Sequence, residues 1–442
     1  MPPFQSISSS IGSVTENRLG VKGQMQEKRR ELRLKKGFDI IVSGYNAGRK
    51  VMKVLFVGSK KQKMTRIFRG LKRLNCTVTA YPIPIEEIGK SEESAHELLG
   101  YLKETGPDFV ISNLFEGVLA TVTQILQIKY AVYGMDSPMF DIYRWEEEAR
   151  FENIFLFLFD KKEHMRLKSG GYTNVYYMPL AADVTTIDKV KITKEETRKY
   201  KCDISFIGSM YSRNTYDQYV ETFPPQLKEV LSFILEQGAL QWNGNDKVMP
   251  LLTPELVDLL RVIVPTIESH PEKFMSDAEF IKYTFLGRKL TNIERTLLLE
   301  LLAEYFDFRL YTWDAEVVSD SIQRFPQVDF DESMKIFRSS KINLNITLRS
   351  IESGVPLRVF DIMGAGGFVL SNRQPEIPEL FEEGREIVTF KTPEEMLEKA
   401  EYYLNHEEER LKIAVNGYRK VKKCYTFEHQ LQKIISILYP SP

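Results

Sequence analysis

The first part of the chain alternates short apolar runs with segments of helical periodicity. The helical segments lie near residues 64–74, 91–104 and 118–127. The apolar runs predict strands at Val51–Gly58, Cys76–Tyr81, Asp108–Ser112, the apolar half of Lys129–Pro138, Ile154–Phe159 and Val175–Met178. Such alternation is typical of a parallel sheet covered by helices on both faces. The pattern therefore predicts an α/β domain over residues 51–185, after a basic extension over residues 1–50.

The same alternation returns after a polar connection. Residues 186–201 are rich in Lys, Glu and Thr with little apolar periodicity, so we interpret them as a linker. A second α/β domain is predicted over residues 202–410, with a helical insertion at about 216–305. The helices over residues 411–442 are expected to pack back on the first domain. The predicted fold class is α/β, with two Rossmann-like domains facing a cleft, because 442 residues exceed one ordinary core.

The stretch Lys341–Glu379 is the most informative part of the sequence. It predicts a strand, a helix from Leu357 and a second strand, which is a parallel crossover unit. Ligands of open α/β sheets bind beyond the carboxyl ends of such strands. Together with the loop after the strand that begins at Cys202, this places a set of candidate donor-binding residues around one crevice. They are Gly208, Ser209, Arg213, Asn345, Arg349, Ser353, Arg358 and Asp361.

These residue types suit a nucleoside diphosphate. Free N–H groups at the helix start, with Arg349 and Arg358, can bind phosphate oxygens, and Asp361 can accept bonds from ribose hydroxyls. Asp136, in a Met-Asp-Ser-Pro turn, and Glu352 are candidate catalytic carboxylates that could orient an acceptor or take its proton. Each of these features also has a purely structural interpretation. The glycine-rich connection can serve only the backbone turn, Asp361 can be a solvated helix residue, and Asp136 can stabilise an Asx turn.

No metal site is predicted. An Asp-x-Asp pair occurs at Asp329–Asp331, but it precedes an apolar-periodic helix, and helix capping explains it better. The three cysteines and five histidines lack ligand spacing. We therefore expect fixed cations to neutralise a diphosphate, with no cofactor besides a nucleotide-sugar donor, for which a UDP-sugar is the first candidate.

Charge is unevenly distributed. The net charge is −1, but residues 22–73 hold 17 Lys and Arg against three acids. This predicts a surface for an acidic membrane face or acidic partner, unless the predicted helix Gln24–Lys36 only carries a solvated face. No nucleic-acid partner is expected. No apolar run reaches the length of a membrane span and no apolar leader is visible, which favours a cytoplasmic protein, peripheral at most at the inner membrane face.

Several segments resemble a known family. The segment SGVPLRVFDIMGAGGFVLSNRQPEIPE (Ser353–Glu379) and the tail NGYRKVKKCYTFEHQL (Asn416–Leu431) are similar to CgeB-like, spore-maturation-type glycosyltransferases. DISFIGSMY from Asp203 and LTNIERTLLLELLAEYFDFRLYT from Leu290 fit the same group. ISNLFEG, YGMDSP and VYYMPLAADV resemble the uncharacterised N-terminal domain that accompanies it. The similarity spans about residues 51–438.

The resemblance implies a GT-B architecture, a nucleotide sugar held mainly by the second domain, no essential metal, and a C-terminal helix that crosses back. Retaining GT-B transferases carry two Glu eight positions apart in this region. Asp361 matches the second, which contacts the donor ribose, whereas Ser353 stands in place of the first and Glu352 is adjacent. The basic N-terminal extension is not covered.

The leading hypothesis is a metal-independent glycosyltransferase that moves a sugar from a nucleoside diphosphate to a protein or cell-envelope glycan. Retention of stereochemistry is expected from the resemblance. Two alternatives remain open: a non-catalytic glycan- or nucleotide-binding module of the same fold, and a sugar-nucleotide epimerase. Neither the sugar, the nucleotide nor the acceptor follows from the sequence.

Overall fold

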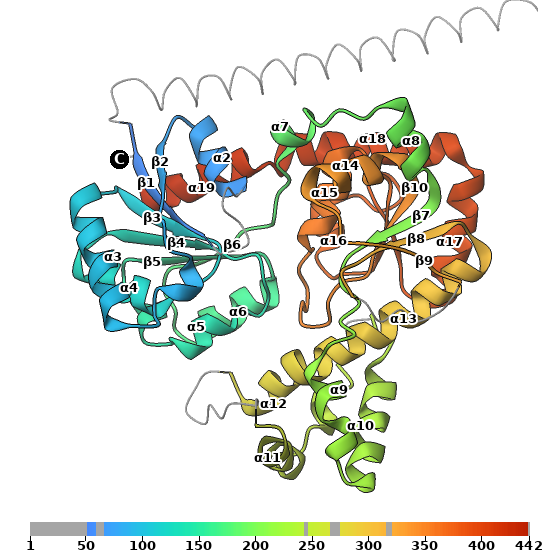
Figure 1. Ribbon diagram of the computed structural model, residues 1–442, viewed down its shortest axis with the longest axis horizontal. Coiled ribbons are helices and arrows are strands. Elements are labelled where there is room, and N and C mark those ends of the chain that lie inside the picture. The colour runs from blue at the N-terminus through green and yellow to red at the C-terminus, as the bar shows by residue number, and fades with distance from the viewer. Residues whose placement is uncertain (1–50, 59–65, 243–245, 266–274, 315–320, 441–442) are drawn as a thin grey trace, which may run out of the picture. The chain divides into compact units, whose positions relative to one another are not determined.

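The computed structural model describes residues 51–58, 66–242, 246–265, 275–314 and 321–440 (Figure 1).

The first of two parallel sheets is built from the N-terminal part of the chain. The strand order is β2-β1-β3-β4-β5-β6, all parallel. The strands are β1 (Lys53–Val57), β2 (Thr77–Ala80), β3 (Phe109–Ser112), β4 (Lys129–Tyr133), β5 (Ile154–Leu158) and β6 (Val175–Tyr177). Its main helices are α2 (Arg66–Arg73), α3 (Glu92–Thr105), α4 (Gly117–Ile125), α5 (Phe140–Arg144) and α6 (Lys161–Ser169). Buried strand residues such as Val57, Ile111 and Val132 explain the continuous apolar runs.

The second sheet is also parallel throughout and has the order β12-β11-β10-β7-β8-β9. Its strands are β7 (Cys202–Ile207), β8 (Phe308–Tyr311), β9 (Gln323–Phe325), β10 (Ser340–Asn345), β11 (Val369–Asn372) and β12 (Val388–Phe390). The order reverses between β7 and β10, which creates a switch point at their carboxyl ends. The edge strand β9 was not predicted, because it is three residues long and mostly exposed.

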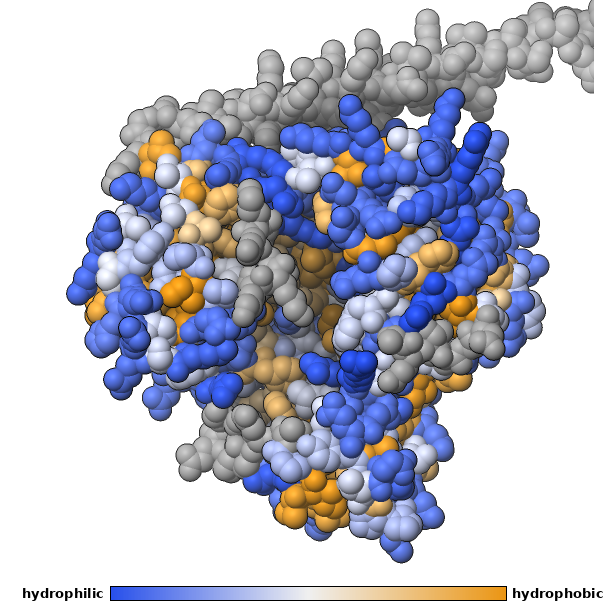
Figure 2. Space-filling view, in the orientation of Figure 1, coloured by the Kyte–Doolittle hydropathy of each residue, from blue (hydrophilic) through white to orange (hydrophobic). Residues whose placement is uncertain are grey.

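The expected helical insertion leaves the sheet after β7 and returns at β8. It contains α9 (Thr215–Tyr219), α10 (Pro225–Gly238), α11 (Pro254–Ile263), α12 (Asp277–Phe280), the π-helix η5 (Ile281–Leu286) and α13 (Gly287–Tyr305). It has its own apolar cluster, in which Leu231, Leu260 and Ile281 are fully buried. Figure 2 shows orange surface at the lower end of the insertion. Val230 and Phe233 of α10 and Leu259 and Val262 of α11 are exposed apolar side chains.

The segment interpreted as a linker contains helical structure that its apolar pattern did not predict. It includes α8 (Lys194–Tyr200), preceded by α7 (Val184–Ile187). Thr193 and Glu196 form a capping box at the start of α8. Glu196 also pairs with Lys335 of α14 (Phe330–Ser339) at 2.6 Å. Capping residues and a tertiary contact therefore stabilise a helix that lacks an apolar stripe.

The remaining helices cover the second sheet and cross to the first. They are α15 (Leu357–Ala365), α16 (Ile377–Leu380), α17 (Pro393–Asn405), α18 (Glu407–Cys424) and α19 (Phe427–Leu438). Gly70 of α2 lies against Leu431 of α19, where a Cβ would collide with the leucine side chain. The backbone of Ala182 donates to the Tyr425 carbonyl at 2.9 Å. The predicted fold class, including the returning C-terminal helix, is confirmed. The extension over residues 1–50, with its predicted basic helix, lies outside the described residues.

Candidate functional site

Two loops leave the second sheet side by side at the switch point. The strands β7 and β10 are parallel neighbours, with Ile204 opposite Ile342. Gly208 follows β7, and its N–H donates to the Tyr311 carbonyl at 2.9 Å. The loop after β10 leads into α15, whose preceding residue Pro356 offers no side-chain cap. The site is therefore built by two loops and one uncapped helix N-terminus.

Arg358 of α15 is the central cation of this site. It packs directly against Gly208, where a Cβ would collide with the guanidinium. The same guanidinium lies 5.0 Å from the ring centre of Phe206. Within the described part of the chain, Arg358 has no hydrogen bond and no ion pair. Burial lowers the pKa of Arg358 to about 9, and the nearby charge of Arg295 acts in the same direction. Asp361 and Tyr211 oppose this lowering without bonding to the guanidinium, so an anion could still bind to it.

Arg295 of α13 supplies a second cation, which the sequence analysis did not single out. Its Nη1 donates to the Ser209 carbonyl, and its Nη2 donates to the Ile346 carbonyl at 2.5 Å. The side chain is buried, and its Nε has no hydrogen-bond partner in the described part of the chain. The signal was a charged Glu294–Arg295 pair inside an apolar helical pattern. Arg295 thus joins the two loops and adds positive charge beside Arg358.

The hydroxyl of Ser209 is bonded to a carboxylate that follows β8. It donates to Oδ2 of Asp314 at 2.9 Å, and the same carboxylate accepts from the N–H of Met210 at 2.5 Å. The Ser212 hydroxyl donates to the other carboxylate oxygen at 2.8 Å. Asp314 therefore fixes the shape of the loop that carries Gly208.

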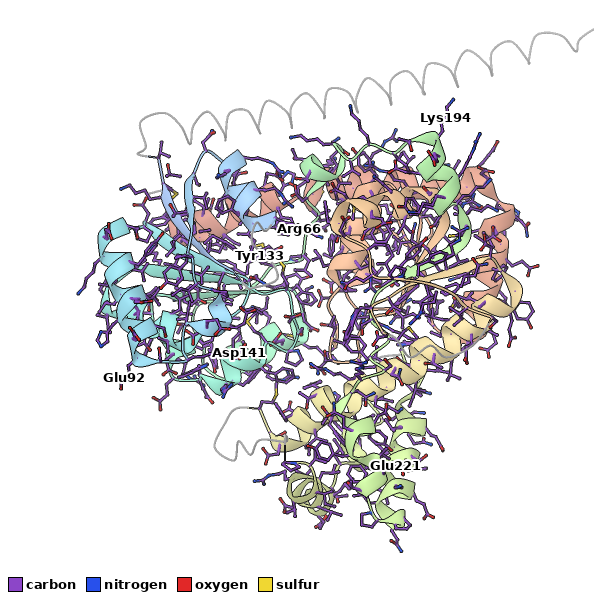
Figure 3. All side chains as sticks on the ribbon, in the orientation of Figure 1. Arg66, Glu92, Tyr133, Asp141, Lys194 and Glu221 are labelled. Carbon is purple, nitrogen blue, oxygen red and sulfur yellow. The ribbon has the colours of Figure 1, made fainter. Side chains whose placement is uncertain are left out.

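Asp361 lies one helical turn after Arg358 and is paired with the first domain. Arg66 of α2 donates from Nη1 and Nη2 to Oδ1 and Oδ2 of Asp361, at 2.6 and 2.8 Å. Figure 3 labels Arg66 where α2 approaches α15. Burial raises the pKa of Asp361, and the contact with Arg66 opposes that rise. Both carboxylate oxygens are thus occupied by a guanidinium.

Ser353 joins the two sheets. Its hydroxyl lies 2.6 Å from Oδ1 of Asp160 and 2.7 Å from Oε1 of Glu376. Asp160, at the start of α6, also accepts the backbone N–H groups of Glu352 and Ser353 at 2.8 and 3.0 Å. Burial raises the pKa of Glu376, while a hydrogen bond from Tyr177 lowers it. Ser353 is therefore a buried connection between the first domain and the loop before α15.

Arg349 anchors the helical insertion. Its Nε donates to the buried Glu294 at 2.8 Å, and its Nη1 and Nη2 donate to the carbonyls of Gln241 and Gly238 at 2.6 and 2.9 Å. All three nitrogens are engaged. Arg349 as a diphosphate ligand stays a prediction, and its contacts make Arg358 the stronger candidate.

Glu352 lies among three cations. Arg166 of α6 donates to its Oε2 at 2.5 Å, and the ammonium groups of Lys282 and Lys162 lie 3.5 and 4.0 Å from Oε1. The carboxylate therefore links the first domain, the insertion and the loop before α15. Its proposed catalytic role is untested by these contacts.

Asp136 is an exposed residue in the turn after β4, and its side chain has no hydrogen bond among the described residues. Partial burial of its carboxylate raises its pKa, and the charge of Arg288 lowers it. Glu163 lies beneath this turn, where its Oε1 accepts the Met139 N–H at 2.7 Å. Burial raises the pKa of Glu163 to about 8. A buried carboxyl therefore supports the turn that presents the candidate base.

The two remaining donor-binding candidates differ in exposure. Asn345 is buried and donates to the hydroxyls of Thr347 and Ser371 at 3.1 and 2.9 Å, so it supports the loop from below. Arg213 is exposed and makes no hydrogen bond or ion pair within the described ranges.

Most of the chain superposes on a solved structure. A sucrose-phosphate synthase from Thermosynechococcus elongatus superposes with a TM-score of 0.50 at 10% identity, covering 88% of this chain and 99% of that one. The chain has the GT-B glycosyltransferase fold. In this GT-B chain, residues 288–436 match the family described as "Glycosyl transferase-like". The matched segment contains Arg295, Arg358 and Asp361.

Other solved structures are similar over their full length. A glycosyltransferase from Rickettsia africae is 12% identical, with a TM-score of 0.49, covering 89% of this chain and 100% of that one. Anabaena HepE in complex with UDP is 10% identical, with a TM-score of 0.45, covering 87% and 100%. A search of curated protein sequences found no match.

The Asp-x-Asp pair takes part in helix capping. Asp329 caps α14 by accepting the Glu332 N–H at 2.8 Å, as predicted. Across the described ranges, no group of three metal-ligating side chains is assembled. Among those same residues, no helix of this GT-B fold is long and apolar enough to cross a membrane.

Proposed function

We propose that this chain is a metal-independent glycosyltransferase of the CgeB-like group, which uses a nucleoside-diphosphate sugar. The observation that carries the proposal is Arg358, a cation without a hydrogen bond or ion pair among the described residues, packed against Gly208. Cleavage of a sugar–diphosphate bond develops negative charge on the departing phosphate, and fixed cations stabilise that charge. Arg358 supplies the charge that a metal ion supplies in other transferases.

The diphosphate site combines three features of the second domain. Arg358 and Arg295 supply positive charge. The start of α15 supplies N–H groups and the positive end of a helix dipole. Gly208 has no side chain, which lets the Arg358 guanidinium lie directly against the loop after β7. Arg213 is exposed in the same loop as Gly208, and its proposed role is a contact with the bound nucleotide.

Asp361 is the proposed ribose contact, which has a structural consequence. Both of its oxygens are bonded to Arg66, so a ribose diol can bind only when Arg66 moves away or shares the carboxylate. Donor binding should therefore loosen the contact between α2 and α15. Retention is the proposed stereochemical outcome, because Asp361 matches the second Glu of the retaining pattern.

Asp136 is the better of the two candidate catalytic carboxylates. Its side chain is exposed and free of hydrogen bonds among the described residues, whereas Glu352 is held by Arg166 at 2.5 Å. Asp136 would orient the acceptor hydroxyl or accept its proton as the new bond to the sugar forms. The acceptor class is a protein or a cell-envelope glycan. The proposal also includes an acidic partner, or the surface of an acidic membrane, for the basic extension over residues 1–50.

The test replaces Arg358 with glutamine and measures nucleotide binding by calorimetry with UDP, GDP and dTDP. Loss of a charged hydrogen-bonding group should weaken the best nucleotide by about 10- to 100-fold. Arg419→Gln is the matched control, because Arg419 is exposed on α18 and has no hydrogen bond or ion pair in the described structure. Equal affinity of wild type and Arg358→Gln for every nucleotide would refute the site.

Turnover separates the transferase from its alternatives. A panel of UDP-, GDP-, dTDP- and CMP-sugars is incubated with the protein in EDTA, and free nucleotide is measured. Slow nucleotide release is expected for a metal-independent transferase. A changed sugar on an intact nucleotide would indicate an epimerase, and binding without any turnover would indicate a non-catalytic module.

A further inference from the structure

A second pocket lies beyond the carboxyl ends of β10 and β11, against the helical insertion. Its lining includes Thr347–Arg349 after β10, Asn372–Pro375 at the end of β11, and Trp242 and Lys282 from the insertion. Its volume is about 110 Å³. Gly208, Arg358 and Asp361 do not line it, so its lining differs from that of the proposed diphosphate site, with Arg349 as the one donor-binding candidate in its wall.

The pocket carries surplus positive charge. Five lining side chains are basic and two are acidic: Lys162, Lys247, Lys282, Arg349 and Arg373 against Asp246 and Glu352. The buried Glu294 compensates Arg349, and Asp246 lies 2.6 Å from Lys282.

Glu352 is shared by Arg166, Lys282 and Lys162, so it cannot neutralise them all. Lys247 has no hydrogen bond or ion pair within the described ranges, and Arg373 has only a 3.6 Å contact with Glu383 there. An anion entering this pocket would therefore meet ammonium and guanidinium groups that the protein's own carboxylates leave partly uncompensated.

Two buried donors in the pocket wall have no partner among the residues that the structure describes. Asn372 is fully buried; its Oδ1 accepts the Thr347 N–H at 2.7 Å, but its Nδ2 makes no hydrogen bond to a described residue. Trp242 is 7% exposed, and its Nε1 also lacks a hydrogen-bond partner within the described ranges. Buried N–H groups are nearly always paired, and leaving one unpaired is costly, so such groups indicate an absent acceptor.

We infer that this pocket binds an oxyanion, a carboxylate or phosphate, carried by the sugar or glycan that accepts the transferred residue. The identification of the ligand as a sugar acceptor rests on the proposed function. The preference for an anion rests only on the contacts of the pocket itself. The surplus cations attract the oxyanion, and the Nδ2 of Asn372 and Nε1 of Trp242 donate to its oxygens. Acceptors that carry acidic groups are then favoured over neutral ones.

The binding test uses glucose 6-phosphate and glucuronate, with neutral glucose as the comparison, titrated into the full chain saturated with UDP. UDP fills the diphosphate site, so further binding reports on the second pocket. Saturable binding of at least one anion is expected, at least tenfold tighter than that of glucose. The preferred anion identifies whether a phosphate or a carboxylate is recognised.

Two variants test the named donors. Asn372→Asp keeps the acceptor for Thr347 but replaces the free NH₂ with a negative oxygen, and should weaken the anion at least 30-fold. Trp242→Phe keeps an aromatic ring and removes only the N–H, and should weaken it about tenfold. Asn405→Asp and Trp313→Phe make the same changes at exposed positions and should bind as wild type. UDP binding by each variant shows that it is folded.

The outcomes separate this inference from the proposed function. No anion binding by wild type, glucose binding as tight as the anions, or unchanged anion affinity in both pocket variants would each overturn the anion pocket. If the pocket variants weaken anion binding but the protein releases no nucleotide from any sugar donor, the anion pocket is supported and the transferase proposal is rejected.

Discussion

Replacing Glu163 with glutamine should stabilise the protein increasingly as the pH rises. Glu163 is 1% exposed, and its Oε1 accepts the Met139 N–H at 2.7 Å. Glutamine has nearly the same shape, keeps an acceptor for Met139, and carries no charge at any pH. The substitution therefore removes the buried ionisation, together with the interactions of the charged form with Ser137 and Arg166, which oppose the rise in its pKa.

The magnitude follows from the pKa. Burial raises the pKa of Glu163 from 4.5 to about 8. Because the folded pKa exceeds the unfolded one, the folded state retains a proton that the unfolded state has released between these values. The contribution of Glu163 is fully present below pH 4.5 and is lost as the pH rises to 8. Each pH unit costs about 1.4 kcal/mol, so the loss reaches about 3 kcal/mol at pH 7 and about 5 kcal/mol above pH 8.

The assay is urea unfolding of wild type and Glu163→Gln at pH 5, 6, 7, 8 and 9, followed by tryptophan fluorescence. The difference between their unfolding free energies should be small at pH 5, grow with pH, and level off above pH 8. Glu152→Gln is the matched control, because Glu152 is exposed in the same domain. Its difference from wild type should stay flat.

A constant difference between wild type and Glu163→Gln across this pH range would refute the reasoning. It would mean that Glu163 titrates alike in the folded and unfolded states. A destabilised Glu163→Gln variant at pH 9 would have the same consequence, because it would show that the buried carboxylate is adequately solvated.

Two further predictions concern Asp361 and the Asp-x-Asp pair. Arg66→Met leaves the buried Asp361 carboxylate unpaired and should lower the free energy of unfolding by about 3 kcal/mol. Adding Asp361→Asn should restore most of this loss. Urea unfolding measures both variants, and a double variant as unstable as Arg66→Met would exclude a specific pair. Asp329→Ala removes the cap of α14 and should lower stability by about 1 kcal/mol, whereas Asp331→Ala should have a smaller effect. Neither alanine variant should alter nucleotide release in EDTA, and loss of metal-stimulated turnover in both would instead support a metal site.

The sequence alone determined the architecture and many helix boundaries. The parallel sheets followed from apolar runs separated by amphipathic segments, because burial on both faces removes strand alternation. Caps are also encoded locally: Thr392 and Thr426 accept N–H groups at the starts of α17 and α19. At α17 no capping box forms, because Glu395 accepts the Lys391 N–H at 2.7 Å and not the Thr392 N–H.

Only the tertiary structure decided which candidate residues have partners of their own. Arg349 and Arg358 were equivalent candidates in the sequence. In the structure, Arg349 bonds to Glu294, 55 positions away, whereas Arg358 has no hydrogen bond or ion pair within the described residues. Arg66 meets Asp361 across 295 positions. Periodicity and capping act over a few residues along the chain, so a sequence can reveal them. The pairing of charges depends on which surfaces the packed sheets and insertion bring together, and this sets whether a cation is left for a ligand.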